Sequence, residues 1–125
     1  MIDKPTESEL EILKVLWSVG ASTVRQVNDR LNETREVGYT TTLKIMQIMA
    51  QKKLVNRDES ARTHVYSAAV NEGDIKNALI DRLMDTAFSG SASQLVMQAL
   101  GRGKASQQEL DKIKDLIKKL EGGDS

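Results

Sequence analysis

The chain has 125 residues, of which 39% are hydrophobic and 29% charged, a composition typical of globular proteins rather than of disordered or membrane-spanning ones. Cysteine is absent, which excludes disulfides, thiolate metal sites and cysteine nucleophiles, and a single histidine argues against a histidine metal site or a Ser–His triad. We therefore expect a cytoplasmic protein with one domain, or a small domain and an appendage, and with no signal peptide, membrane segment, metal or cofactor.

Charge is balanced overall, with 18 basic and 18 acidic residues, but it is unevenly distributed. No acidic residue occurs from Val37 to Arg57, a window that includes Lys44, Lys52 and Lys53. A basic window is typical of a surface that approaches phosphate, although most short charge imbalances are merely solvated faces. The window therefore keeps nucleic-acid binding open without establishing it.

Capping boxes, in which a hydroxyl residue is followed three positions later by Glu or Gln, mark several helix starts. They are Thr6–Glu9, Thr23–Gln26, Ser91–Gln94 and Ser106–Glu109, and Asn71 can cap a further helix. The first two boxes, and the periodicity that follows them, predict helices over about 6–18 and 23–32, with a third over about 39–53.

These three short amphipathic helices can close a small core. We expect Trp17 to be its largest single contributor, and Thr42 to face inward although Thr40 and Thr41 face out. The apolar stripes are Leu10, Leu13, Leu16 and Trp17; Val24, Val27 and Leu31; and Thr42, Ile45, Met46 and Met49.

After Lys53 the hydrophobic period changes from helical to alternating. Residues 54–57 and 63–66 are predicted strands, separated by the polar stretch 58–62. Three helices followed by a hairpin form the plan of a winged helix-turn-helix, in which the third helix enters the major groove and the hairpin is the wing. The predicted fold class is mainly α, with a winged-helix DNA-binding domain over 1–70.

From Asn71 the pattern is helical again and predicts a three-helix dimerisation domain over 71–125, ending in a loose tail from Gly122. Three apolar stripes on about fifty residues are more than one small antiparallel layer can bury. A symmetric dimer would bury them across a two-fold axis, and the alternative is that these helices fold back on the first domain. The candidate dimerisation residues are Ile75, Leu79, Leu83, Phe88, Leu95, Val96, Ala99, Leu110, Ile113 and Ile117.

Several stretches together resemble the penicillinase-repressor family (Bla/Mec/Cop type). They are EILKVLW at 11–17, REVGYTTTL at 35–43, ARTHVY at 61–66, FSGS at 88–91 and the pair Leu95-Val96, and the resemblance extends from about 6 to 120. It implies a dimeric winged-helix transcriptional repressor that binds operators of dyad symmetry built on TACA/TGTA-type elements. Such repressors keep resistance or metal-homeostasis genes silent.

The resemblance places the DNA-reading surface on the third helix and the wing. Threonine hydroxyls can bond base edges or phosphate oxygens, and threonine methyl groups can contact the methyl group of thymine. The candidate DNA-binding residues are Tyr39, Thr40, Thr41, Leu43, Lys44, Gln47, Lys52, Arg62 and His64.

This sequence also departs from the family pattern. Ile48 stands where arginine is usual, and Lys53 and Ala61 stand where glycines are common, so operator preference can differ. In the β-lactam branch a sensor-protease system leads to cleavage of an Asn-Phe bond. The corresponding bond here is Gln98–Ala99, which weakens the expectation of the same cut. The cysteine pairs of the copper branch are absent.

The sequence predicts a homodimeric repressor that binds a double-stranded DNA operator, with a regulatory protease as a candidate partner and no small-molecule ligand. The alternative is a winged-helix protein-interaction module that does not bind DNA. An enzyme is disfavoured because the sequence has no Gly-rich phosphate loop, no nucleophile with a base and no metal cluster. Glu7, Glu9, Glu11, Asp81 and Asp85 fall on predicted helix exteriors, where we expect them to be solvated.

Overall fold

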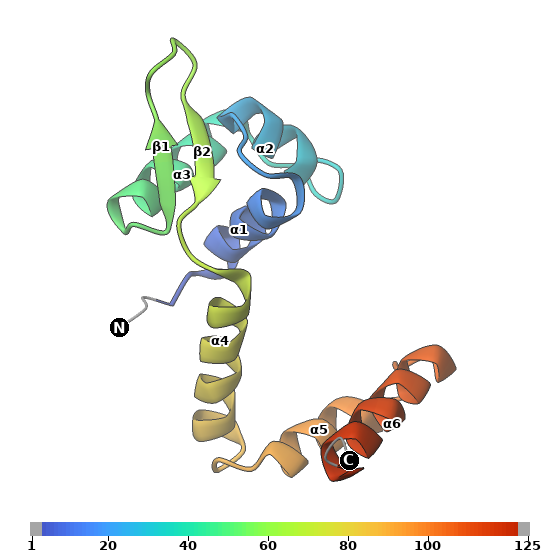
Figure 1. The fold of residues 1–125 in the computed structure, drawn as a ribbon. Helices are drawn as coiled ribbons and strands as arrows, with labels where there is room; N and C mark the ends of the chain where they lie inside the picture. The colour runs from blue at the N-terminus through green and yellow to red at the C-terminus, as the bar shows by residue number, and fades with distance from the viewer. Residues whose placement is uncertain (1–3, 123–125) are drawn as a thin grey trace. The chain divides into compact units, whose positions relative to one another are not determined.

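A computed structural model describes residues 4–122, so most of the predicted tail lies outside the described residues (Figure 1). The described chain is mainly helical with one two-stranded antiparallel sheet, which confirms the predicted fold class. None of its helices is long and apolar enough to cross a membrane. The elements are α1 (Glu7–Val19), α2 (Val24–Leu31), α3 (Tyr39–Gln51), β1 (Val55–Asp58), β2 (Val65–Ala68), α4 (Glu72–Ala87), α5 (Ala92–Gly101) and α6 (Gln107–Gly122).

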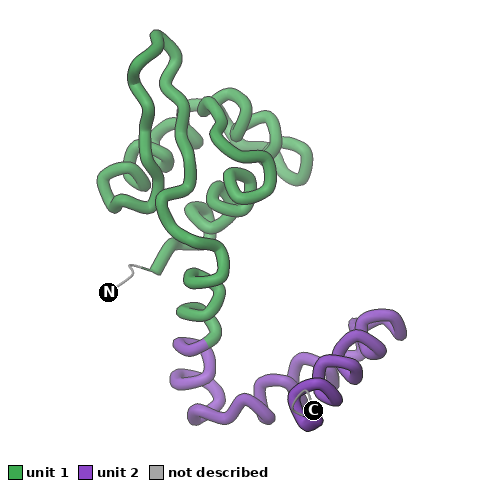
Figure 2. The backbone as a smooth tube through the Cα atoms, in the orientation of Figure 1, with its two compact units in different colours: residues 1–80 green, residues 81–125 purple. Residues whose placement is uncertain are grey.

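The chain forms two compact units, residues 1–80 and 81–125, coloured separately in Figure 2. The division falls within α4, whereas the sequence places the domain boundary before this helix, at residue 70. The first unit contains α1 to α3, the hairpin and the first part of α4, and the second contains the end of α4 with α5 and α6.

Local capping fixes where the helices begin. At α1 the Glu9 amide donates to Thr6 Oγ1 at 3.2 Å, and the Thr6 amide donates to Glu9 Oε1 at 2.9 Å. The same reciprocal pair forms between Thr23 and Gln26 at the start of α2. Because the first amides of a helix have no partner inside it, these side chains satisfy donors that would otherwise need water.

The core of the first unit is formed by one buried face of each helix together with the hairpin. Tyr66, 1% exposed, is its largest fully buried side chain, so the expectation for Trp17 was wrong. Trp17 is half-buried at the edge of the core, where its indole N–H donates to the Val70 carbonyl at 3.1 Å. The stripe of α1 also differs by one position, because Ile12 is buried while Leu10 is half-buried.

The C-terminus of α3 ends in a Schellman motif. The Leu54 amide donates to the Met49 carbonyl at 2.9 Å, and the Lys53 amide donates to the Ala50 carbonyl at 3.1 Å. This closure requires the left-handed conformation at Lys53, whose φ is 66°. Glycine adopts that conformation freely, whereas a residue with a Cβ pays on the order of 1 kcal/mol. This left-handed conformation explains why the family pattern has a glycine at the position of Lys53.

The hairpin pairs Val55 with Ala68 and Asp58 with Val65, so its strands begin one and two residues later than predicted. An isolated antiparallel bridge between Ser22 and Tyr66, beside the hairpin, was not predicted. The Ser22 amide donates to the Tyr66 carbonyl at 2.9 Å, and the Tyr66 amide donates to the Ser22 carbonyl at 2.8 Å. This bridge fastens the start of α2 to the hairpin.

Glu9 is buried, at 3% exposed, and the expectation that it is solvated was wrong. Its carboxylate accepts from Lys52 Nζ at 2.8 Å, which joins the first turn of α1 to the end of α3. Burial alone raises the pKa of the Glu9 carboxyl, but hydrogen bonds from Lys52 and Thr6 to the charged form outweigh it and leave the pKa lowered.

A carboxyl whose pKa is lowered by folding stabilises the protein above its unfolded pKa, and this stability is lost as pH falls through the folded value. We expect Glu9→Gln to lower the free energy of unfolding at pH 7 by about 1.5–3 kcal/mol, the range for hydrogen bonds to charged groups. The difference in unfolding free energy between the wild type and Glu9→Gln should shrink below about pH 4, near the ordinary pKa of glutamate. Urea denaturation at pH 7 and pH 3, with Glu7→Gln as the exposed control, measures this; a deficit that does not change with pH would contradict it.

Candidate nucleic-acid interface

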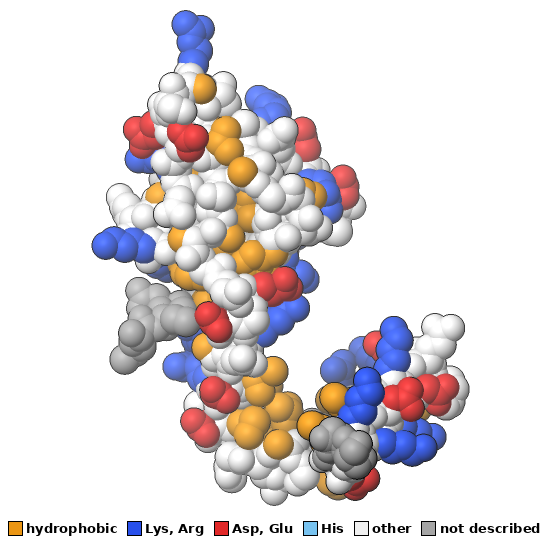
Figure 3. All heavy atoms as spheres, viewed as in Figure 1, with side chains coloured by type: hydrophobic (Ala, Val, Ile, Leu, Met, Phe, Trp, Pro, Cys, Tyr) orange, Lys and Arg blue, Asp and Glu red, His pale blue; other side chains and the backbone are white. Residues whose placement is uncertain are grey.

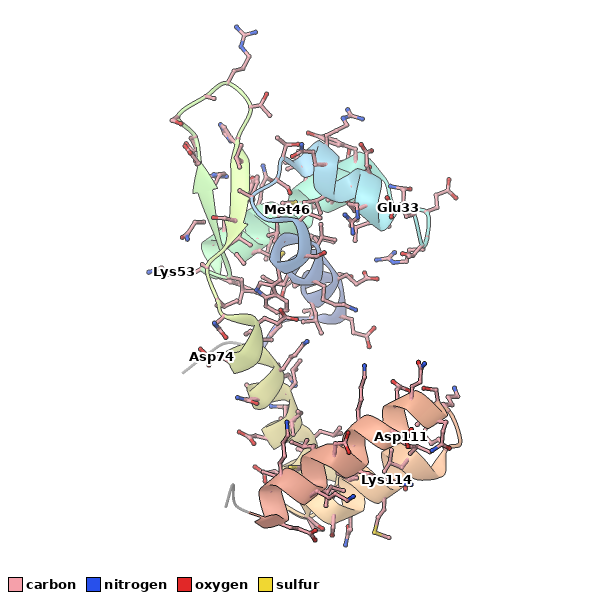
Figure 4. The ribbon with its side chains drawn as sticks, turned by 45° about the vertical axis from the view of Figure 1, so that its right-hand side comes forward. Glu33, Met46, Lys53, Asp74, Asp111 and Lys114 are labelled. Carbon is pink, nitrogen blue, oxygen red and sulfur yellow. The ribbon has the colours of Figure 1, made fainter. Side chains whose placement is uncertain are left out.

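The side chains of α3 form three rows along the helix. The inner row is fully buried and packs into the core, where Figure 4 shows Met46 among the helices. The second row faces the hairpin, and the third row, together with Thr41, faces solvent. The rows are Thr42, Met46 and Met49; Tyr39, Leu43 and Gln47; and Thr40, Lys44 and Ile48.

A buried hydrogen-bond network holds the inner row in place. Asn28 Nδ2, on α2, donates to Thr42 Oγ1 at 2.8 Å and to the Val37 carbonyl at 3.0 Å. Thr42 Oγ1 in turn donates to the Gly38 carbonyl at 3.3 Å. Every buried side-chain nitrogen and oxygen of the described residues has a partner, so this polar contact inside an apolar core carries no unpaired group.

Asn32 holds the loop that leads into α3. Its Nδ2 donates to the Asn28 carbonyl at 2.8 Å and to the Val37 carbonyl at 2.9 Å, while the Val37 amide donates to Asn32 Oδ1 at 3.1 Å. On the outside of the same loop, Arg35 donates to both oxygens of Glu11 on α1, at 2.5 and 3.2 Å. The start of α3 is thus fixed from both sides, which sets the direction of its exposed rows.

A cleft lies between the second row of α3, the start of α2 and the hairpin. Figure 3 shows a basic side chain at the tip of the hairpin, whose loop contains Arg62. The residues that line the cleft are Thr23, Val24, Arg25, Tyr39, Leu43, Gln47, Arg57, Arg62, Thr63, His64 and Tyr66.

This cleft brings together most of the sequence-predicted contacts. Tyr39, Leu43 and Gln47 line it from α3, and Arg62 and His64 line it from the hairpin. The candidates Thr40, Thr41 and Lys44 are exposed on the adjacent surface of α3. Lys52 is the exception, since its ammonium group is paired with Glu9 rather than directed to the cleft.

Two arginines of the cleft, Arg25 and Arg57, were not among the predicted DNA contacts, although Arg57 closes the acid-free window of the sequence. Arg57 lies on β1, and its Nε is 2.6 Å from Glu59 Oε2, so its charge is partly offset. Arg25 lies on α2, and its guanidinium carbon is 4.9 Å from the centroid of the Tyr39 ring. A signal for Arg25 was present in the sequence, because a basic residue in the first turn of a helix is unfavourable beside the positive end of the helix dipole.

The model of the penicillinase repressor family matches residues 5–119, nearly the whole chain. The chain belongs to the penicillinase repressor family. It is 29% identical to the transcriptional regulator BlaI of Mycobacterium tuberculosis over 117 residues, 92% of this chain and 83% of that protein. It is 20% identical to the penicillinase repressor of Bacillus licheniformis over 93% of this chain and 91% of that protein.

Solved structures support the fold of this penicillinase repressor family member. The DNA-binding domain of the repressor BlaI, determined in solution, matches with a TM-score of 0.52 and 24% identity, covering 59% of this chain and 90% of that one. A complex structure of hsRosR-S4 matches with a TM-score of 0.56 and 18% identity, covering 99% of this chain and 96% of that one. Family membership places the protein among DNA-binding transcriptional repressors.

The three residues that depart from the family pattern lie in different parts of this repressor. Ile48 is 41% exposed in the outer row of α3, so an apolar group stands on the candidate DNA surface. Ala61 is exposed in the hairpin loop. Lys53 occupies the left-handed end of α3, with its side chain outside the core in Figure 4.

The second unit of this repressor leaves its apolar side chains largely uncovered. No residue of α5 or of the described α6 is buried, and Leu83, Val96 and Ile117 are each 45% exposed. Among the other dimerisation candidates, Leu79, Phe88, Leu95, Leu110 and Ile113 are half-buried and Ala99 is exposed. Ile75 differs from all of them in being buried, at 1% exposed, and both Ile75 and Leu79 lie in the part of α4 that belongs to the first unit.

The bond that corresponds to the cleavage site of the β-lactam branch lies inside a helix. Gln98 and Ala99 are both exposed on α5, which runs unbroken from Ala92 to Gly101. Exposed loop tips are the preferred sites of proteolytic nicking, so a cut here would first require α5 to unwind locally.

The buried contact between α2 and α3 gives a stability prediction. Thr42→Val keeps the shape of the side chain but removes the hydroxyl group that pairs with Asn28, so we expect the free energy of unfolding to fall by about 1–3 kcal/mol. The matched control is Thr41→Val, at an exposed position of the same helix, with an expected change within about 0.5 kcal/mol. Urea denaturation followed by circular dichroism compares the two, and equal losses would show that the Asn28–Thr42 contact has no special weight.

Proposed function

We propose that the protein binds a DNA operator of dyad symmetry as a homodimer, through α3 and the hairpin, and thereby represses transcription. The observation that carries this proposal is the exposed face of α3, whose hydroxyl and lysine side chains lie beside a cleft lined with arginine. From Val37 to Arg57 the chain has no acidic residue that would repel phosphate. The anchoring of Thr42 in the core supports a fixed presentation of this face.

In the proposed complex, α3 lies in the major groove with its N-terminal end toward the DNA. Thr40 and Thr41 are in the first turn, where low helix propensity costs little and where free amides and the helix dipole favour phosphate. Their short branched side chains fit close to base edges and thymine methyl groups. Lys44, one turn further along, reaches a phosphate or a guanine.

The hairpin provides a second contact in this proposal. Arg62, in the loop between β1 and β2, is suited to the phosphate backbone or the minor groove beside the site of α3. His64 lines the cleft from the base of the same loop.

Dimerisation is proposed from the uncovered apolar surface of the second unit. Its helices do not bury that surface among themselves, since no described residue of α5 or α6 is buried. Pairing the same face of two copies buries it and generates a two-fold axis. Two copies of α3 related by this axis would read half-sites about one helical turn apart, or a multiple of it.

Recognition by α3 is tested on a duplex selected by the wild-type protein from a random pool. We expect Thr41→Ala and Lys44→Ala each to weaken binding by roughly 5- to 150-fold, the equivalent of 1–3 kcal/mol for one contact. Lys14→Ala, at an exposed position of α1, is the control and should bind as the wild type does. Gel-shift titration measures the affinities, and wild-type binding by both α3 variants would remove this helix from the mechanism.

Dimerisation through the second unit is tested with Leu83→Asp. The substitution places a charge on the apolar surface of α4, so we expect a monomer whose DNA affinity is strongly reduced. Asn77→Asp adds the same charge at an exposed polar position of this helix and should leave the mass unchanged. Light scattering coupled to gel filtration gives the masses, and a Leu83→Asp variant with the mass of the wild-type dimer would refute the assignment.

A further inference from the structure

Arg25 occupies a position that is unfavourable for the helix it belongs to. α2 begins at Val24 after the N-cap Thr23, and its first turn has no acidic residue. A positive charge in this turn opposes the helix dipole. Arg25 is exposed and has no carboxylate partner among the described residues, whereas Arg30 on the same helix is paired with Glu33. Residues that break a local rule without a local benefit are expected at functional sites.

Tyr39 determines where this guanidinium group is held. The Arg25 guanidinium carbon lies over the Tyr39 ring, 4.9 Å from its centroid, which is within the range of a cation–π interaction. Tyr39 is the first residue of α3, so the contact joins the starts of the two helices. The Tyr39 side chain is itself packed along the cleft, and the residue remains 40% exposed.

This arrangement leaves the hydrogen-bonding edge of Arg25 available. A guanidinium group carries five N–H donors in its plane, and a cation–π contact forms no hydrogen bond to the carboxylate or phosphate oxygens that these donors bind. The planar fork matches two oxygens of one phosphate. Among the arginines of the cleft, Arg57 is already engaged with Glu59, which distinguishes it from Arg25.

We propose that Arg25 and Tyr39 form a phosphate clamp, in which the guanidinium group of Arg25 binds a backbone phosphate of the DNA beside the groove entered by α3. Tyr39 acts as a positioning residue, because its ring orients the guanidinium group. This inference rests on the proposed function, and it adds a contact that fixes the register of α3 but does not read sequence.

The salt dependence of binding tests the clamp. Each phosphate contact contributes about 0.9 to the slope of log affinity against log salt, so we expect Arg25→Gln to reduce the slope by about that amount. The loss of affinity should be equal on the selected duplex and on a scrambled one, because a phosphate carries no sequence information. Arg25→Lys should keep the slope but bind more weakly, since it retains the charge and loses the planar fork. Arg30→Gln is the matched control and should keep the wild-type slope.

The role of Tyr39 is tested in two backgrounds. We expect Tyr39→Phe, which keeps the aromatic face, to bind DNA more tightly than Tyr39→Leu, which removes it. In the Arg25→Gln background Tyr39→Leu should have little further effect, because the group that it orients is gone. A purely structural role for Tyr39 would instead lower affinity equally in both backgrounds, and circular dichroism checks that each variant is folded.

The outcomes separate the clamp from the proposed function. A wild-type slope for Arg25→Gln, or a loss of affinity confined to the selected duplex, would overturn the clamp while leaving DNA binding by the protein intact. No retention of the wild-type protein on any duplex at low salt would overturn the proposed function itself, and the clamp with it.

Discussion

The amide of Asn28 and the hydroxyl of Thr42 lie 2.8 Å apart in a core that is otherwise largely apolar. This hydrogen bond forms only in one geometry, because a rotation of α3 about its axis would move the Thr42 hydroxyl away from the Asn28 amide and break it. Apolar contacts alone would tolerate small rotations, since they have no direction. The hydrogen bond therefore selects which residues of α3 are buried, and with them which rows face a partner.

The two units differ in how completely they bury their apolar side chains. The first has a continuous core, paired buried polar groups and a bridge from Ser22 to Tyr66 that joins its helices to the hairpin. The second exposes apolar side chains on each of its helices, including Met97 at 71% and Leu120 at 73%. Contiguous exposed apolar surface in a soluble protein marks a site of interaction. In the proposed dimer the stability of the second unit would depend on protein concentration, unlike the internal packing of the first.

Features set within a few residues could be predicted from the sequence, whereas features that join distant residues could not. The reciprocal capping boxes at Thr6, Thr23 and Ser106 and the inward position of Thr42 follow from spacing alone, and the structure confirms them, whereas at Ser91 only the bond from the Gln94 amide forms. Glu9 was misjudged because its partner Lys52 is 43 positions away, and nothing local marks a carboxylate for burial. The pairing of Arg25 with Tyr39 likewise requires two helix starts to be brought together.

Trp17 is the only tryptophan of the chain, and its indole N–H is bonded to the Val70 carbonyl at the edge of the first unit. Its fluorescence consequently reports the folding of that unit and carries little direct information about α5 or α6. Far-ultraviolet circular dichroism, in contrast, sums over the helices of both units. If one unit melts before the other, the two spectroscopic signals will give different midpoints for the same sample, and the order of melting can be read without any labelling.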